Sequence, residues 1–374
     1  MNNKKRIQIL CWIGIVIFFL AACSSPTITK VPQAATTIPT VTPQLNSYPL
    51  SEFGPYHVGM RSIMVKDPSR GNRRVPINVW YPALEVQGST NSVPIRDADP
   101  DFNGAPYPLI LSSTKVARIF APYLVSHGFT WASVEGLDTY SSFSVEAIDQ
   151  PLDILFALDQ VAATPPEGLE GMIDSDNSGT IGYSFDGFNS LVMSGARIDP
   201  QYYLSQCPNP DATTKAILGG LSAYSCTPSL KWDEFTAQLD ESITSSQDGL
   251  WQPLTDPRIR AVMPMAGEGW WLFGERGLAA VDRPVMIIVG TNDELYKENV
   301  LIYEHLGTSD KQLISFIGLG HMMVYDQEMT ARMAHFAIAF FRYHLQGSQD
   351  MAKYFSKDFV AQHNDLFWGV YSGE

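Results

Sequence analysis

The pattern of apolar and polar positions predicts strands that alternate with helices along most of the chain. Short apolar runs bounded by glycine, proline or polar residues are typical of strands. Such runs lie at 60–65, 75–81, 108–112, 130–134, 179–183, 259–265, 285–289 and 312–317. Apolar residues recur with helical spacing at 119–126, 145–162, 188–192 and 323–345.

This alternation predicts an α/β protein with a mostly parallel central sheet that helices cover on both faces. The strands at 60–65 and 75–81 have no helix between them, so they predict an antiparallel edge. The segment 197–257 has mixed polar composition and weak helical patterns, and it is too long for a simple connection. We therefore expect an inserted lid there, above the sheet.

The first 22 residues predict a secretory signal peptide. Lys4, Lys5 and Arg6 precede an apolar run at 9–20, and the segment ends in Leu-Ala-Ala-Cys at Cys23. This ending resembles the lipobox of bacterial lipoproteins, which implies cleavage before Cys23, lipidation of that cysteine and an extracytoplasmic protein anchored to the cell membrane. The alternative is an uncleaved anchor helix, although the run is shorter than the roughly 20 residues of a membrane span.

Residues 23–51 are rich in Thr, Pro, Ser and Ala and predict an extended tether, which leaves 52–374 for one large domain that contains the lid. The formal charge of −14 argues against nucleic acid or an anionic bilayer as a partner. Cys207 and Cys226 are the two cysteines beyond Cys23. In an exported protein such a pair predicts a disulfide, and two free buried thiols are the alternative.

Ser184 is the candidate nucleophile. A strand of small residues at 179–183 runs into it and a helical pattern follows at once, which is typical of a nucleophile elbow. Gly182 provides the small residue two positions before the serine. Asp186 stands where a second glycine is expected, and Gly187 comes one residue late. The alternative is an ordinary Ser-Gly turn.

Two further residues stand at strand ends, where ligands bind in an open α/β sheet. Asp293 follows the strand at 285–289, and His321 follows the strand at 312–317. A serine hydroxyl needs a base that a third group orients, and the chain order Ser, Asp, His is that of α/β-hydrolases. We therefore predict a Ser184–His321–Asp293 triad.

Each of these residues also has a simpler interpretation. Asp293 could cap the helix that follows it, and His321 could be a loop histidine. Glu268, after the strand at 259–265, is the rival for the acid. The oxyanion requires two backbone N–H donors, which we expect from Phe185 and from the loop after 108–112, at Lys115 or Val116.

Several segments resemble one group of proteins. They begin at Gly54 (Gly-Pro-Tyr-His-Val-Gly-Met), Val79 (Val-Trp-Tyr-Pro-Ala) and Pro151 (Pro-Leu-Asp-Ile-Leu-Phe-Ala-Leu-Asp), and they include the elbow, Gly-Thr-Asn-Asp at 290–293 and Gly-Leu-Gly-His at 318–321. Together they resemble bacterial α/β-hydrolases related to dienelactone hydrolase and secreted platelet-activating-factor acetylhydrolase. The resemblance implies a serine esterase acting on short-acyl esters or acetylated phospholipids, without metal or organic cofactor.

Two positions depart from that family. Its oxyanion loop usually reads Ser-His-Gly, whereas this chain has Ser113, Thr114 and Lys115, and Asp186 replaces a glycine. A carboxylate near a developing oxyanion would repel it, unless Lys115 paired with Asp186. Two functions therefore stay open: a lipid-anchored serine esterase, or a hydrolase-fold lipoprotein without catalysis that serves as a surface binding or scaffold module.

Overall fold

The computed structural model describes residues 48–373 except 137–142, 208, 211, 219–221, 245 and 246. The expected signal peptide, Cys23 and most of the expected tether lie outside the described residues. Among the helices that the structure describes, none combines the length and the apolar character that crossing a membrane requires.

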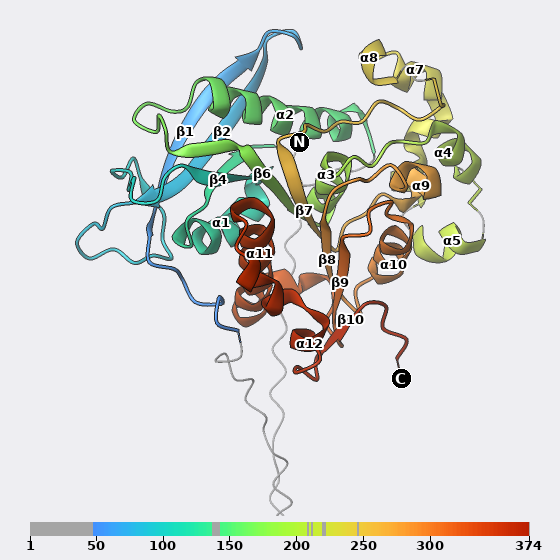
Figure 1. Ribbon diagram of the computed structural model, residues 1–374. Coiled ribbons are helices and arrows are strands. Elements are labelled where there is room, and N and C mark those ends of the chain that lie inside the picture. The colour runs from blue at the N-terminus through green and yellow to red at the C-terminus, as the bar shows by residue number, and fades with distance from the viewer. Residues whose placement is uncertain are drawn as a thin grey trace, which may run out of the picture. The chain divides into compact units, whose positions relative to one another are not determined.

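In the described part of the chain, ten strands form one mixed sheet in the order β10-β9-β8-β7-β6-β4-β5-β2-β1-β3 (Figure 1). Their bounds are β1 His57–Asp67, β2 Arg73–Ala83, β3 Ile95–Arg96, β4 Tyr107–Ser113, β5 Thr130–Val134, β6 Ile173–Tyr183, β7 Ile259–Met265, β8 Val285–Gly290, β9 Lys311–Phe316 and β10 Leu366–Trp368. Strands β9 to β5 in this order pair in parallel, whereas β2 with β5, β1 with β2 and β9 with β10 are antiparallel. The prediction of a mostly parallel α/β sheet with an antiparallel edge is confirmed.

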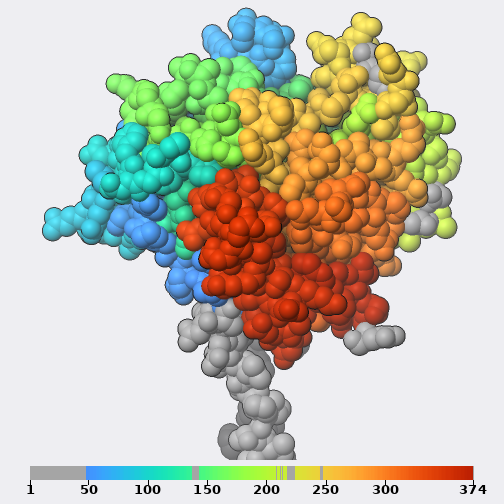
Figure 2. Space-filling view, viewed as in Figure 1, coloured from blue at the N-terminus to red at the C-terminus, as the bar shows by residue number. Residues whose placement is uncertain are grey.

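Helices cover both faces of this sheet. Leu109 and Leu111 of β4 pack in the apolar cluster that includes α2 (Val145–Ala163), whereas Ile110 packs in the cluster that includes α1 (Thr114–Ser126). This alternation follows from the two-residue period of a strand. On the α1 face, α11 (Gln327–Gln346) packs against α1 and contacts β6 and β7. Figure 2 shows the C-terminal residues, in red, as a continuous block on this surface.

Three more helices belong to the central layers: α3 (Phe185–Met193), α9 (Trp270–Leu278) and α10 (Tyr296–His305). The helix expected at 323–345 begins later, because residues His321–Tyr325 form a 3-10 turn instead. Asp326 then starts α11, since its carboxylate accepts the N–H groups of Glu328 and Met329 at 3.0 Å. After α11 come a 3-10 turn, Gln349–Phe355, and α12 (Lys357–Val360).

The folded part begins before the expected boundary at residue 52. Tyr48 and Leu50 are only 3% and 8% exposed. The Tyr48 hydroxyl accepts from Arg332 Nη2 at 2.8 Å, and the Leu50 N–H donates to His335 Nδ1 at 3.1 Å. These contacts fix the last residues of the expected tether on α11, so the tether is shorter than the composition suggested.

The segment 197–257 lies between α3 and β7 and consists of short helices. They are α4 Pro200–Gln206, α5 Ala212–Leu218, α6 Ser222–Cys226, the 3-10 helix Thr227–Lys231, α7 Trp232–Thr236 and α8 Glu241–Thr244. Figure 1 shows α4 beside α9 at one side of the sheet, with α7 and α8 above them, and α4 packs against α9. Whether this insertion closes over a substrate stays a prediction.

A disulfide joins Cys207 and Cys226, whose Cα atoms are 5.3 Å apart. The bond ties the end of α4 to the end of α6. Closing a loop of this size stabilises a fold by about 3 kcal/mol in the chain-entropy model. Tyr203 lies next to the bond, fully buried between the rings of Trp232 and Trp271. The insertion therefore has its own small core, which continues into α9.

Candidate active site

Ser184 stands on a strained turn between β6 and α3. Its φ and ψ are 60° and −124°, a conformation that a residue with a side chain rarely adopts. The turn is so tight that a Cβ on residue 182 would lie 1.8 Å from the carbonyl oxygen of Asp186. Gly182 is therefore required by space. Such a turn lifts the serine hydroxyl out of the end of the strand.

Gly187, which the sequence places one residue late, is required for a different contact. A Cβ there would lie 2.5 Å from the Cα of Gly267, in the loop between β7 and α9. The first turn of α3 therefore packs backbone to backbone against that loop. This contact explains why residue 187 is a glycine.

Ser184, His321 and Asp293 form a continuous line of hydrogen bonds. Ser184 Oγ lies 3.0 Å from His321 Nε2, and His321 Nδ1 lies 3.1 and 3.0 Å from the two oxygens of Asp293. The Asp293 carboxylate is fully buried and also accepts the N–H of Leu295 at 2.9 Å. Because this carboxylate can only accept, Nδ1 carries the proton and Nε2 is left to accept from Ser184.

The electrostatics of the site favour a basic imidazole. Burial alone lowers the pKa of His321, but the hydrogen bond to Asp293 and the charges of Asp293 and Glu294 outweigh burial and Lys115, so the pKa lies above its usual value. A neutral imidazole is needed to accept the serine proton. The imidazole is therefore more basic than that of an ordinary histidine, and it becomes protonated at a higher pH.

The rival acid, Glu268, lies in another environment. Burial and then the charge of Glu298 raise the pKa of Glu268 to about 8. Burial also raises the pKa of Glu298 to about 7, although its carboxylate accepts the N–H groups of Gly269 and Trp270 at 2.7 and 2.9 Å. Glu298 thus fixes the loop that packs on Gly187, while Asp293 is the carboxylate that contacts His321.

These two carboxyl groups predict that the protein loses stability as the pH rises from about 6.5 to 8; below that range the buried His127 and His335, whose pKa values are lowered to about 4 and about 3, have the opposite effect. Because the pKa values of Glu268 and Glu298 are raised, both carboxyl groups keep their protons in the folded state at pH values where the unfolded chain has released them. Their protonated forms stabilise the folded state fully at pH values below the pKa of a glutamate in the unfolded chain. This stabilisation is lost as the pH rises through the pKa of each group in the folded protein, at up to about 1.4 kcal/mol per pH unit for each group. Urea unfolding at several pH values should show this decline, and Glu268→Gln should reduce it. The exposed Glu275→Gln is the matched control, and an equal decline in Glu268→Gln and wild type would refute the effect.

The expected oxyanion loop at 113–116 is a helix instead. Helix α1 begins at Thr114, directly after β4, so Lys115 and Val116 lie in its first turn. Phe185 is likewise the first residue of α3. The first N–H groups of a helix have no partner within it and favour negative charge. The residues expected to supply the donors therefore lie at two helix ends and not in a loop.

Asp186 pairs with Ser113, which the sequence did not predict. The Ser113 hydroxyl donates to Asp186 Oδ2, and Asn189 Nδ2 donates to Asp186 Oδ1 at 3.1 Å. The pairing of Asp186 with Lys115 stays a hypothesis. Asn189 could have been found as the residue three positions along the same helix. No sequence signal points to Ser113.

A hollow of about 640 Å³ adjoins His321. Its apolar lining comes from Leu319, Met322, Met323 and Met329, and Met322 is 67% exposed. Methionine side chains adapt to ligands of varied shape. The hollow could therefore receive an apolar part of a substrate beside the imidazole.

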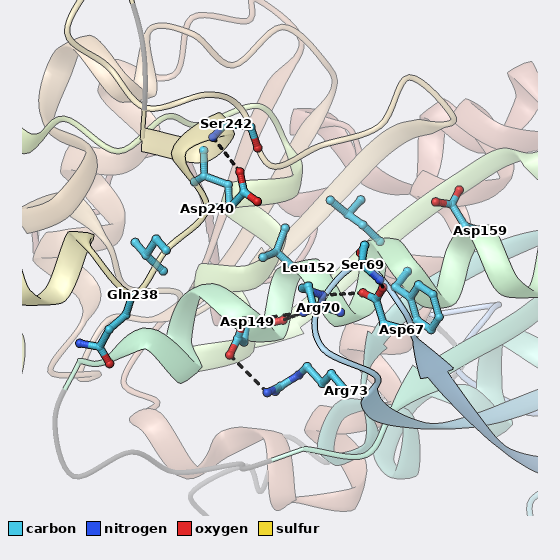
Figure 3. Close-up of a pocket in the computed structure, with 14 residues that line it drawn as sticks. Asp67, Ser69, Arg70, Arg73, Asp149, Leu152, Asp159, Gln238, Asp240 and Ser242 are labelled. Atoms are coloured by element: carbon cyan, nitrogen blue, oxygen red, sulfur yellow. Dashed lines mark hydrogen bonds and ion pairs between the residues drawn. The ribbon is translucent and has the colours of Figure 1, made fainter.

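A second hollow, of about 900 Å³, lies between α2, the β1–β2 turn and the insertion (Figure 3). Arg70 and Arg73 point at the carboxylates of Asp67 and Asp149, and both also pair with Asp153. The lining contains none of the triad residues. Because the charges pair with one another, this cluster holds the β1–β2 turn on α2.

Asp293, Glu294 and His321 also have potential metal-binding atoms within 4.8 Å of one another. Within the triad, however, both nitrogens of His321 already have hydrogen-bond partners, Asp293 and Ser184. A metal ion bound by the imidazole would have to displace one of them. The arrangement favours proton transfer over metal binding.

Comparisons with known proteins do not identify a family. No protein-family model matches the chain, and no curated protein matches it either. The resemblance of the sequence segments to particular hydrolases therefore stays a prediction, and the function rests on the geometry of the residues.

Proposed function

We propose that this protein is a serine esterase of the α/β-hydrolase fold. The observation that carries the proposal is the hydrogen-bonded line from Ser184 through His321 to the buried Asp293, with its nucleophile on a strained strand–turn–helix. The chain order of these residues, after β6, β8 and β9, is also that of α/β-hydrolases. A serine whose proton is accepted by an oriented imidazole is the arrangement for acyl transfer.

In the proposed reaction, His321 Nε2 accepts the proton of Ser184 as Oγ attacks the carbonyl carbon of an ester. The negative charge on the carbonyl oxygen is stabilised by the N–H of Phe185 and by the first turn of α1, at Lys115 or Val116. His321 then donates its proton to the departing alcohol. Water releases the acyl group by the same steps in reverse, and Asp293 stabilises the imidazolium each time.

The proposed substrates are short-acyl esters, with acetylated phospholipids as one class. The sequence resemblance suggests these classes, and the methionine-lined hollow beside His321 is compatible with an apolar substituent. The mechanism described above requires no metal or organic cofactor.

The second candidate is a binding or scaffold module that has lost catalysis. The observation in its favour is Asp186, whose buried carboxylate lies two residues after the nucleophile, where it opposes a developing oxyanion.

A fluorophosphonate probe and a series of p-nitrophenyl esters separate the two candidates. The esterase should become labelled at Ser184 within minutes and should hydrolyse acetate and butyrate esters faster than long-chain esters, because the probe reacts only with an activated serine. Labelling is read by peptide mass spectrometry. A folded protein that neither reacts with the probe nor hydrolyses any ester would support the binding module.

The proposal includes a lipid anchor at Cys23, outside the described residues. Mass spectrometry of membrane fractions should find a diacylglyceryl group on Cys23 and no peptide from residues 1–22, because two acyl chains hold a protein firmly at a bilayer. Cys23→Ser should abolish the diacylglyceryl modification, whereas the Cys207→Ser, Cys226→Ser double variant should not. A mature protein that begins elsewhere and is not bound to membranes would contradict the anchor.

A further inference from the structure

A buried polar chain runs directly behind the nucleophile. Its members are Ser113, Asp186, Asn189 and Gln150, which are 1%, 6%, 1% and 4% exposed. Ser113 donates to Asp186, while Asn189 Nδ2 donates to Asp186 Oδ1 at 3.1 Å and to Gln150 Oε1 at 2.6 Å. Buried polar groups are costly unless they are hydrogen-bonded, so such a chain fixes the relative positions of its members.

This buried polar chain joins helices and strands that are far apart in the sequence. Ser113 ends β4 and precedes α1, Asp186 and Asn189 belong to the first part of α3, and Gln150 belongs to α2. The Ser113 hydroxyl does not cap its own helix, although serine is a favoured N-cap residue. It donates instead to the carboxylate on α3. The hydrogen bond between Ser113 and Asp186 therefore links the beginnings of α1 and α3.

Those two helix ends are the ones that supply the expected oxyanion donors. The Asp186 carboxylate lies in the first turn of α3 and accepts from the residue before α1, so the positive ends of both helix dipoles favour its charge. Glycine, the residue that the elbow pattern expects at this position, has no side chain to make this link. The carboxylate thus adds an unfavourable charge near the oxyanion but fixes the spacing of its donors.

We propose that Asp186 is a positioning residue that acts through Ser113 to set the distance between the first turns of α1 and α3. This inference rests on the proposed esterase function. Asp186 does not touch the substrate. Its link to Ser113 determines how well the N–H groups of Phe185 and of α1 converge on the oxyanion, and therefore affects the chemical step more than substrate binding.

The test compares Ser113→Ala, Asp186→Ala and the double variant with wild type. The readouts are the second-order rate of fluorophosphonate labelling, kcat and KM for p-nitrophenyl acetate, and the thermal midpoint. Each single variant should lower kcat and the labelling rate by about 10- to 100-fold, the value of a hydrogen bond to a charged group, with KM changed less than about threefold. The double variant should be no slower than the slower single variant, because both remove the same link.

Ser194→Ala is the matched control. Ser194 is also fully buried beside α3, but its hydroxyl donates to the carbonyl of Leu191 and takes no part in the polar chain. It should keep wild-type labelling and turnover even if its thermal midpoint falls. This comparison separates a positioning effect from a general loss of stability.

Three outcomes would overturn the inference. Labelling of Asp186→Ala at the wild-type rate or faster would mean that the carboxylate only opposes the oxyanion. Losses that multiply in the double variant would mean that the two residues act separately. Losses in kcat no larger than those of Ser194→Ala, at the same drop in thermal midpoint, would mean that the residues only stabilise the fold. If Asp186→Ala fails to fold, the labelling rate and kcat of Ser113→Ala, compared with those of Ser194→Ala, test the inference in its place. A wild-type protein that is never labelled refutes the esterase function itself, and with it this inference.

Discussion

Replacing Ser184 with alanine is expected to abolish ester hydrolysis and fluorophosphonate labelling. In the proposed mechanism this hydroxyl oxygen forms the acyl bond, and among the described residues it is the partner of His321 Nε2. Removing a single triad member costs on the order of 10⁴ to 10⁶ in turnover. The thermal midpoint should stay nearly unchanged, because alanine adopts the positive φ of this turn as readily as serine does.

The measurement is initial-rate hydrolysis of p-nitrophenyl acetate, together with probe labelling and thermal unfolding of the same preparations. Ser194→Ala serves again as the control, because it removes a serine hydroxyl elsewhere on α3. Near-normal hydrolysis by Ser184→Ala would exclude this serine from the mechanism and leave the strained turn without a catalytic explanation.

Asp293→Asn is expected to lower kcat by about 10⁴-fold, whereas Glu268→Gln should change it only a few-fold. Asparagine fills the same space, but it can donate to Nδ1 and so favours the wrong tautomer of His321. The pKa of His321 should also fall, because the hydrogen bond and charge of Asp293 are the causes that raise it. The residual activity of the variant should therefore persist to lower pH than that of wild type.

The pH dependence of kcat/KM for wild type and the two variants decides this prediction. For wild type, kcat/KM should fall on the acidic side with a midpoint above the usual histidine pKa of about 6.5. If Glu268→Gln were the more damaging change, the orienting acid would belong after β7 and not after β8. An unshifted acidic limb in Asp293→Asn would show that another group sets the basicity of the imidazole.

The sequence was sufficient for the central sheet and for the positions of the candidate triad. Strands such as 130–134 and 259–265 are short apolar runs with clear ends, so local pattern alone defines their bounds. Ser184, Asp293 and His321 each follow a run of this kind, and parallel strands bring their ends to one edge.

What the sequence could not predict are contacts between residues far apart in the chain. The link from Ser113 to Asp186 spans 73 residues, and it depends on how two helix ends meet. The sequence pattern also placed a loop at 113–116 where α1 begins, because the polar run Ser-Ser-Thr-Lys at 112–115 fits a loop as well as a helix start that Ser113 could cap. Tyr48 was assigned to the tether because its neighbours are polar, although its ring packs on the distant α11.

The last strand of the sheet has a consequence for aggregation. β10 pairs with residues 314–316 of β9, and the N–H of Gly369 donates to the carbonyl of Leu313 at 2.7 Å. These few C-terminal residues occupy backbone groups that would otherwise be an open template for strand addition by another molecule. A C-terminal truncation before residue 366 would therefore endanger solubility more than catalysis, and a purification tag is safer when it extends the C-terminus than when it replaces it.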